Sequence, residues 1–216
     1  SGDWGGLQGC PTCPPRPADH RKAIFAQSRP FVAGADDCAQ QRVAEQMRQR
    51  AARHETEPDY ILNVGDNFYW GGIYAECGKQ PAYDIQSKPQ WEAVYEKMYH
   101  GPGVDGKQWL GVLGNHDYGG YKFTGGWDQT IGYTWGGGTG RWMTPAQYWS
   151  AKVWYIGFSV DYYFVDSNVW SVMNVDSDQG HNLCSQEHNG ELATCGEQGP
   201  KDLETCPGWF GRLWAR

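Results

Sequence analysis

The strongest constraint on the fold comes from two short apolar runs that are each followed directly by a glycine and then by polar residues. They are residues 60–64 (YILNV) and 109–113 (WLGVL). Runs of this length and composition are typical of strands buried on both faces of a parallel sheet. Apolar residues recur with helical spacing before the first run, at 36–54, and between the runs, at 89–100. This alternation of helix and strand predicts an α/β fold.

The second half of the chain is expected to hold one long loop and two more strands. Residues 117–150 are rich in glycine and aromatic side chains, and loops of that length inside a domain usually carry function. Strands are predicted at 153–159 and 162–166. In α/β sheets, ligands bind beyond the carboxyl ends of the strands, so the polar residues found there carry the functional interpretation.

A chain of 216 residues is long enough for one domain with a sizeable core, which we expect to span residues 1–216. Two parts of it are expected to be irregular: a Cys/Pro/Gly-rich insertion at 7–35 and a Cys-rich tail at 172–216. The net charge of −7, without any lysine or arginine run, argues against a nucleic-acid partner. No apolar stretch is long enough to be a transmembrane segment, and any targeting segment is expected upstream of Ser1.

Seven cysteines stand mostly in loops rich in Gly, Pro and polar residues. Their density predicts disulfides and an oxidising compartment, so the protein is expected to be secreted or lumenal. We expect at least one bonded pair among Cys184, Cys195 and Cys206. A zinc site at the CxxC of residues 10–13 is the alternative, but it would need a second pair at similar spacing, and none follows.

Three clusters of polar residues beside glycines mark the candidate site: residues 2–5 (GDWG), 65–69 (GDNFY) and 114–118 (GNHDY). Taken singly, an Asp at a strand end is often only a helix N-cap. Together, the clusters offer carboxylate, amide and phenolate oxygens, which suit Fe(III), Mn(II) and Mg(II) and are accepted by Zn(II). Two cations that share a carboxylate can clamp the attacking and leaving oxygens of a phosphoryl displacement.

These clusters resemble the first three motifs of the purple acid phosphatases, which belong to the calcineurin-like metallophosphoesterases. The resemblance runs from residue 1 to about 168. It implies an α/β fold that is part of a four-layer αββα sandwich, incomplete at both ends. It further implies a phosphoric monoester hydrolase, a phosphate-ester substrate and a binuclear metal centre of Fe with Fe, Zn or Mn.

The resemblance assigns four metal ligands to this chain. Asp3 would bind the first metal, an iron in the family, and Tyr69 would bind the same metal and give the purple colour. Asp66 would bridge both metals, and Asn115 would bind the second one.

Other roles follow from the same resemblance or from neighbouring residues. His116 would be catalytic rather than a ligand, facing the substrate phosphate and the leaving group, with Asp117 orienting its ring. Asp166 would be structural. The Gly-rich residues 135–140 are expected to form a flap near the site, and Arg141 a surface salt bridge rather than a phosphate contact.

The sequence also departs from the family. Three further histidines are needed, two of them from a Gly-His-x-His motif, and no such motif is present. His181 and His188 are the only histidines after Asp166, and they stand in a polar Cys-containing segment where ligands are not expected. The strand that would precede Asp3 is also missing.

Two hypotheses stay open. Either the segment belongs to a longer phosphatase that supplies the missing histidines, or it is a non-catalytic, phosphatase-derived module, a pseudoenzyme kept for binding protein partners in a larger assembly. On the first hypothesis, the segment alone is expected to hold at most one metal, weakly, and to be a very poor phosphatase. On the second, the module has lost its metals.

Overall fold

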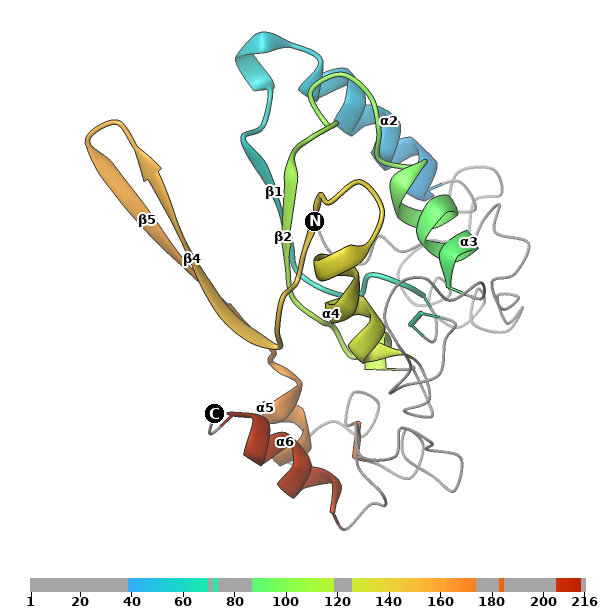
Figure 1. Ribbon diagram of the computed structural model, residues 1–216, viewed down its shortest axis with the longest axis vertical. Coiled ribbons are helices and arrows are strands. Elements are labelled where there is room, and N and C mark those ends of the chain that lie inside the picture. The colour runs from blue at the N-terminus through green and yellow to red at the C-terminus, as the bar shows by residue number, and fades with distance from the viewer. Residues whose placement is uncertain are drawn as a thin grey trace, which may run out of the picture.

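A computed structural model of the chain describes residues 39–69, 72–73, 87–118, 126–173, 183–184 and 205–214. Within them the chain has a mixed α/β structure, with a three-stranded parallel sheet, helices beside it and a separate two-stranded hairpin (Figure 1). The α/β class predicted from the sequence is therefore confirmed, while the four-layer sandwich stays an expectation.

The parallel sheet has the strand order β1-β2-β3. Its strands are β1 (Tyr60–Asn63), β2 (Gln108–Gly111) and β3 (Trp142–Met143). Ile61 pairs with Trp109 in the register of β1 and β2. The first two strands lie where the apolar runs predict them, and because the pairing is parallel, the segments that follow them leave the sheet at the same edge.

Helices α2 (Ala39–Ala51) and α3 (Lys88–Trp91) lie side by side along the sheet (Figure 1). Helix α3 continues as a π-helical turn over Glu92–Glu96. The Gln40 side-chain amide joins the two by donating a hydrogen bond to the Val94 carbonyl, at 2.9 Å. Both helices occur where their apolar spacing predicts them, with shorter bounds.

The core between these helices and the sheet is largely aromatic. The Trp91 ring stacks on Tyr133, with 3.6 Å between the ring centroids, and meets Trp142 edge-on at 4.9 Å. Trp109 is fully buried in the same cluster. Much of the unusual aromatic content of the chain is therefore used for packing, where large rings bury the most apolar area.

Tyr133 belongs to α4 (Trp127–Gly136), a helix that the sequence did not predict. The expectation of one continuous loop over 117–150 is wrong for this part. Glycines at 126, 132 and 136 obscure the helical spacing of the apolar residues. Packing of Trp127 and Tyr133 against two different core clusters stabilises the helix in spite of them.

Strands β4 (Tyr148–Tyr155) and β5 (Phe158–Val165) form an antiparallel hairpin. The predicted bounds were wrong here, because the chain reverses at residues 156–157 within one of the expected strands. Gly157 has a φ of 90°, a conformation that suits glycine, and so allows the tight turn. The Trp149 indole N–H ties the hairpin to the sheet by donating to the Gly111 carbonyl, at 2.9 Å.

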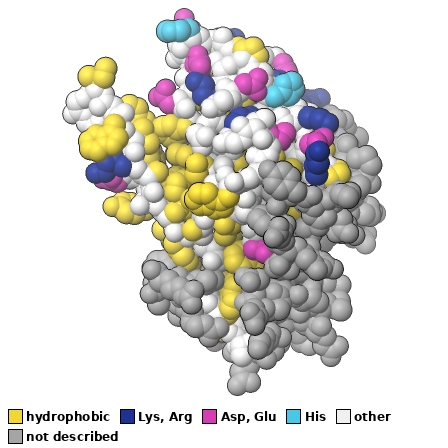
Figure 2. All heavy atoms as spheres, viewed as in Figure 1, with side chains coloured by type: hydrophobic (Ala, Val, Ile, Leu, Met, Phe, Trp, Pro, Cys, Tyr) yellow, Lys and Arg dark blue, Asp and Glu magenta, His cyan; other side chains and the backbone are white. Residues whose placement is uncertain are grey.

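Figure 2 shows apolar side chains over the hairpin and along the strip between it and the parallel sheet. Exposed apolar residues of the hairpin include Trp154, Phe158 and Tyr163, and Leu62 and Val64 at the end of β1 are exposed as well. No helix in the described part of the chain is long and apolar enough to cross a lipid bilayer.

A second core cluster lies below the sheet and holds α5 (Asn168–Met173) and α6 (Cys206–Trp214). A disulfide joins Cys184 to Cys206, with an S–S distance of 2.00 Å. The predicted bond within the Cys-rich tail is therefore confirmed. Phe210 of α6 packs edge-on against Tyr118, at 5.6 Å between ring centroids, which connects the tail to the polar cluster that follows β2.

Candidate metal centre

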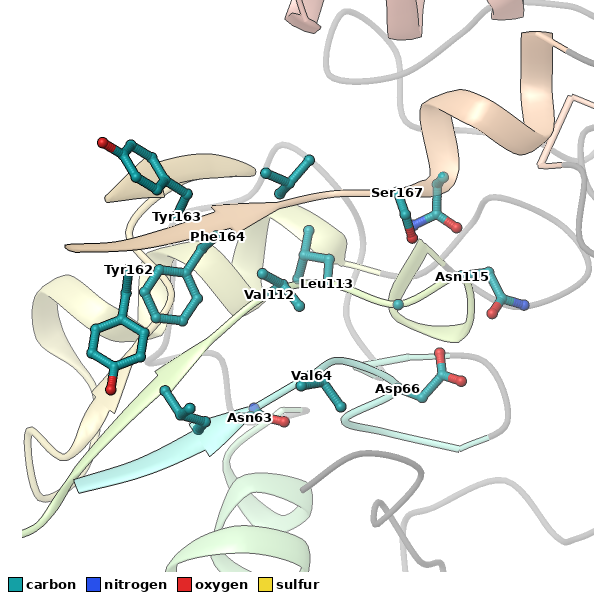
Figure 3. A pocket seen from close by; sticks show the side chains of 14 residues that line it. Asn63, Val64, Asp66, Val112, Leu113, Asn115, Tyr162, Tyr163, Phe164 and Ser167 are labelled. Atoms are coloured by element: carbon teal, nitrogen blue, oxygen red, sulfur yellow. The ribbon is translucent and has the colours of Figure 1, made fainter. Parts of the chain in front are cut away.

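The two polar clusters that the structure describes meet at one edge of the parallel sheet. Asp66 follows the end of β1 and Asn115 follows the end of β2, and both line a cavity of about 530 Å³. Figure 3 shows their side chains on facing turns at one end of this cavity. Tyr162 and Phe164 of β5 form the opposite wall. Asp3, the fourth predicted ligand, lies outside the described residues.

Backbone geometry explains why a glycine precedes both Asp66 and Asn115. Gly65 has a φ of 94° and Asp66 a φ of 49°, so the chain turns through the left-handed region as it leaves β1. Asp is one of the few residues other than glycine that visit this region routinely. A Cβ on Gly65 would lie 2.6 Å from the backbone nitrogen of Gly114, so the two turns pack backbone against backbone.

The Asp66 carboxylate is the centre of this arrangement. Its Oδ2 accepts a hydrogen bond from the Tyr69 hydroxyl at 2.9 Å, and its Oδ1 accepts one from the His116 backbone N–H at 3.2 Å. The rings of Tyr69 and His116 lie next to each other, with 4.5 Å between their centroids. The structure thus brings Asp66, Tyr69 and His116 into mutual contact, with Asn115 lining the same cavity as Asp66.

Asp117 does not play the part expected from the sequence. It was expected to orient the His116 ring, but its buried carboxylate accepts hydrogen bonds from backbone N–H groups on both turns. The donors are Gly114 at 2.8 Å, Asn67 at 2.9 Å and Phe68 at 3.3 Å. The direction of a side chain cannot be read from a motif, and the backbone donors outcompete the neighbouring ring.

Asn67 is a site residue that the sequence analysis missed. It is fully buried, and its side-chain amide donates to the Asp117 carboxylate at 2.8 Å and to the Val112 carbonyl at 3.1 Å. Its side-chain oxygen accepts a hydrogen bond from Asn63 in β1. The sequence did hold a feature that could have identified Asn67, because this residue directly follows Asp66 in the motif. An amide that is buried there needs several hydrogen-bond partners.

The charge state of Asp117 reflects two opposing effects. Burial raises the pKa of its carboxyl to about 8, the Gly114 N–H opposes this shift, and the charge of Asp66 adds to it. The N–H donors that contact both carboxylate oxygens stabilise the ionised form and so oppose the rise in pKa.

Asp166 has the structural role that the sequence analysis expected of it. It is fully buried and accepts hydrogen bonds from the Tyr118 hydroxyl and from the backbone and side chain of Asn168. Burial raises the pKa of this carboxyl, and those hydrogen bonds oppose the shift. Gln147 completes the network by donating to the Tyr118 oxygen at 2.6 Å.

The Gly-rich segment and Arg141 lie elsewhere, which corrects two expectations. The Gly140 carbonyl accepts a hydrogen bond from Gln108 at the amino end of β2, so this segment is at the edge of the sheet opposite to Asp66 and is no flap over the site. Arg141 does form a salt bridge, to Glu96 at 2.7 Å, but both side chains are largely buried. The sequence could not show this burial, because it depends on contacts with Tyr95, Glu96 and Tyr99, more than forty positions away.

The donor set can be compared with what a metal centre needs. A carboxylate, a phenol hydroxyl and an amide offer oxygen ligands, which hard cations prefer, so these residues fit part of a site for iron or manganese. No group of three or more His, Cys, Asp or Glu side chains suited to a metal occurs among the residues that the structure describes. His54 and His100 are exposed, and His181 and His188 lie outside the described residues.

A parallel sheet with a carboxylate, a phenol, an amide and an imidazole beyond its strand ends defines a candidate metallohydrolase. Comparison with protein families agrees: the model described as calcineurin-like phosphoesterase matches residues 16–194. The chain therefore belongs to the calcineurin-like phosphoesterase family. The matched range contains Asp66, Tyr69, Asn115 and His116 and begins after Asp3.

Two curated proteins of Arabidopsis thaliana are similar to part of the chain. Purple acid phosphatase 17 is 37% identical over 60 residues, which is 28% of this chain and 14% of that protein. Purple acid phosphatase 7 is 38% identical over 60 residues, which is 28% of this chain and 15% of that protein. The similarity thus spans a small part of either relative.

Proposed function

We propose that this chain carries part of the active site of a metal-dependent phosphoric monoester hydrolase of the purple acid phosphatase type, within the four-layer αββα sandwich that its family implies. The observation that carries the proposal is the position of the Asp66 carboxylate. It accepts hydrogen bonds from Tyr69 and from the His116 backbone, and it lies beside Asn115 at the carboxyl edge of a parallel sheet.

The proposed roles follow from the donor types. Asp66 has two oxygens and would be shared by two metal ions, with Tyr69 and Asp3 on one of them and Asn115 on the other. When bound, such a pair of iron, zinc or manganese ions supplies an acidified water and neutralises charge on the phosphate. Because recognition of this kind addresses the phosphate, the substrate is proposed only as a phosphate ester.

His116 is proposed as the catalytic residue. Its backbone N–H is held by the Asp66 carboxylate, and its ring lies against Tyr69, so the imidazole is placed beside the metal ligands without being needed as one. An imidazole at this place can hydrogen-bond a phosphate oxygen and donate a proton to the leaving oxygen.

The remaining imidazole ligands are proposed to come from polypeptide beyond this segment, and the native protein is proposed to be secreted or lumenal. The disulfide between Cys184 and Cys206 supports an oxidising compartment. The alternative is a non-catalytic, phosphatase-derived module that binds other proteins. The experiment described next tests metal binding and turnover separately, so that it also tests this alternative.

The test is to titrate the 216-residue chain with Fe(III) and to record visible absorption, since a tyrosine ligand gives iron a charge-transfer band. We expect at most one weakly bound iron, a weak band and very slow hydrolysis of an aryl phosphate at acidic pH. Tyr69→Phe should abolish the band. Tyr163→Phe is the matched control, because this tyrosine is 77% exposed on the hairpin.

Three outcomes would change the interpretation. A band that survives Tyr69→Phe would exclude Tyr69 as the iron ligand. A chain that binds no metal at all would favour the non-catalytic module. Turnover comparable to that of an ordinary enzyme, lost in Asp66→Asn, would show that histidines already present in this chain complete the site.

A further inference from the structure

We propose that Asp117 is a positioning residue, which fixes the turn that carries Asp66 relative to the turn that carries Asn115. The inference rests on the proposed function of Asp66 and Asn115 as metal ligands. Asp117 touches neither a metal nor a substrate in this proposal, and it acts only through the two turns.

The hydrogen-bond donors to Asp117 come from both turns. One carboxylate oxygen of Asp117 accepts from Gly114 at 2.8 Å, directly before Asn115. The two oxygens together accept from the backbone of Asn67 and Phe68, directly after Asp66. A single buried side chain is therefore hydrogen-bonded to both ligand-bearing turns, and it joins segments that are about fifty positions apart in the sequence.

Only a carboxylate fits these contacts. Both oxygens accept, and each of them faces at least two N–H groups: Oδ1 those of Asn67 and Phe68, and Oδ2 those of Gly114 and the Asn67 side chain. In the isosteric Asp117→Asn variant, whichever way the amide is turned, its NH₂ group would point at N–H donors. Buried donors would then lose their acceptor, which is costly.

These contacts also maintain an uncommon backbone conformation. Asp66 has a φ of 49°, in the left-handed region, which Asp adopts more readily than most residues but which the surrounding structure must still hold. The hydrogen bonds of Asp117 to Asn67 and Phe68 fix the backbone immediately after Asp66. A carboxylate that is shared by two metal ions must hold its oxygens in a fixed position, so this conformation matters for the proposed site.

The test compares Asp117→Asn with two controls in the full 216-residue chain. Asp161→Asn removes the same charge from an exposed pair with Lys152 on the hairpin. Val94→Ala removes two methyl groups from a fully buried side chain of the core cluster packed against α2, and so lowers stability without removing a hydrogen bond from either turn. The readouts are amide hydrogen exchange of Gly114, Asn67 and Phe68, and the affinity for Mn(II) followed by electron paramagnetic resonance.

In Asp117→Asn we expect the backbone amides that face the new NH₂ group to exchange about tenfold faster or more, since they lose their acceptor. These are Gly114 in one orientation of the amide, and Asn67 and Phe68 in the other. Affinity for Mn(II) should fall by about 10- to 100-fold, as is typical when residues that support metal ligands are replaced. Neither control should change the exchange of these amides relative to the rest of the chain, and neither should weaken Mn(II) binding.

The inference would be overturned if the amides of Gly114, Asn67 and Phe68 exchanged no faster in Asp117→Asn than in the wild type. It would also be overturned if Val94→Ala, at equal stability, showed the same faster exchange and the same loss of Mn(II) affinity. If Asp117→Asn does not fold, Asn67→Ser removes only one of the donors and should give a smaller change in the same direction. A wild-type chain that binds no Mn(II) contradicts the proposed function, while the exchange data still decide the role of Asp117.

Discussion

Gly114 and Asp66 approach each other so closely that a Cβ on Gly114 would lie 2.1 Å from Oδ1 of Asp66 and 2.4 Å from its backbone nitrogen. Atoms at such distances overlap, so an alanine at 114 can be accommodated only if one of the two turns moves. The glycine is therefore required by the geometry of the site, apart from any conformational freedom that it provides.

Gly114→Ala should destabilise the fold by about 1–3 kcal/mol, as overpacked positions do, and should weaken Mn(II) binding. Gly106→Ala is the control, because a Cβ there meets no atom within 4 Å and only the backbone, at a φ of 76°, opposes it. Urea unfolding and Mn(II) titration check both variants. Unchanged metal affinity in Gly114→Ala would show that the turns can separate without harm to Asp66.

Removal of the disulfide should destabilise the lower core cluster. In Cys184→Ala combined with Cys206→Ala, the free energy of unfolding should fall by about 2–4 kcal/mol, because the crosslink restricts the unfolded chain. Both cysteines are buried, so part of the loss also reflects packing. Urea unfolding followed by tryptophan fluorescence measures the change. A reductant should lower wild-type stability much more than that of the double variant, and equal sensitivity would contradict the prediction.

Tyr118→Phe should cost about 1–3 kcal/mol, because the lost hydroxyl bridges Asp166 and Gln147, both of which are buried. Thermal and urea unfolding give the loss. The same change at Tyr163, which is exposed on the hairpin, should stay within about 0.5 kcal/mol. A loss at Tyr118 no larger than at Tyr163 would mean that water replaces the hydroxyl inside the network.

The buried pair of Glu96 and Arg141 predicts a particular dependence of stability on pH. Burial would raise the pKa of Glu96, but hydrogen bonds from Arg141, Thr139 and Tyr133 outweigh it and hold the pKa below its ordinary value of 4.5. The folded state therefore favours the ionised form. Its contribution is fully present above pH 4.5 and is lost as the pH falls through the lower folded-state pKa.

Glu96→Gln should remove this part of the acid sensitivity, measured as the slope of unfolding free energy against pH below 4.5. At neutral pH the variant should also lose about 3–5 kcal/mol, since Arg141 would stay buried without its partner. The control is Glu92→Gln, whose exposed pair with Lys97 should contribute little to stability. Parallel pH profiles for Glu96→Gln and wild type would contradict the assignment.

The sequence predicted those parts of the fold that local pattern controls. Continuous apolar runs are typical of parallel strands, so β1 and β2 were found, and α2 has clear helical spacing. The expected burial of β1 on both faces was wrong, because only Ile61 and Asn63 of it are buried while Leu62 is exposed. Helix α4 was missed because its stability comes from tertiary contacts of Trp127 and Tyr133 rather than from its glycine-containing sequence. The hairpin turn was missed because Ile156 and Gly157 interrupt no apolar pattern.

The residues of the candidate site were predicted from their types, but the hydrogen bonds between them were not. The motifs indicated Asp66, Tyr69 and Asn115, because oxygen donors after strand ends imply a shared edge of the sheet. The contacts of Asp117 depend on which way its side chain points and on donors about fifty positions away, neither of which a motif contains. Arg141 illustrates the same limit, since its burial follows from helix packing and not from its neighbours in the chain.

The two kinds of strand pairing also have a consequence for the order in which the chain folds. Tyr155 and Phe158 pair across the hairpin only three positions apart (158 minus 155), whereas Tyr60 and Gln108 of the parallel sheet are 48 positions apart (108 minus 60). Closing the longer loop costs more chain entropy, so parallel pairing should be slow.

Hairpins can form in about 1–10 μs, and β4 and β5 should therefore pair first, while β1 and β2 are still apart. During that interval the Trp149 indole has no carbonyl of β2 to dock on, and the apolar face of the hairpin stays open to other chains. Pulse-labelled hydrogen exchange should find hairpin amides protected before those of β2. The nascent protein would then be most prone to aggregate at its hairpin, before the edge that holds Asp66 and Asn115 exists.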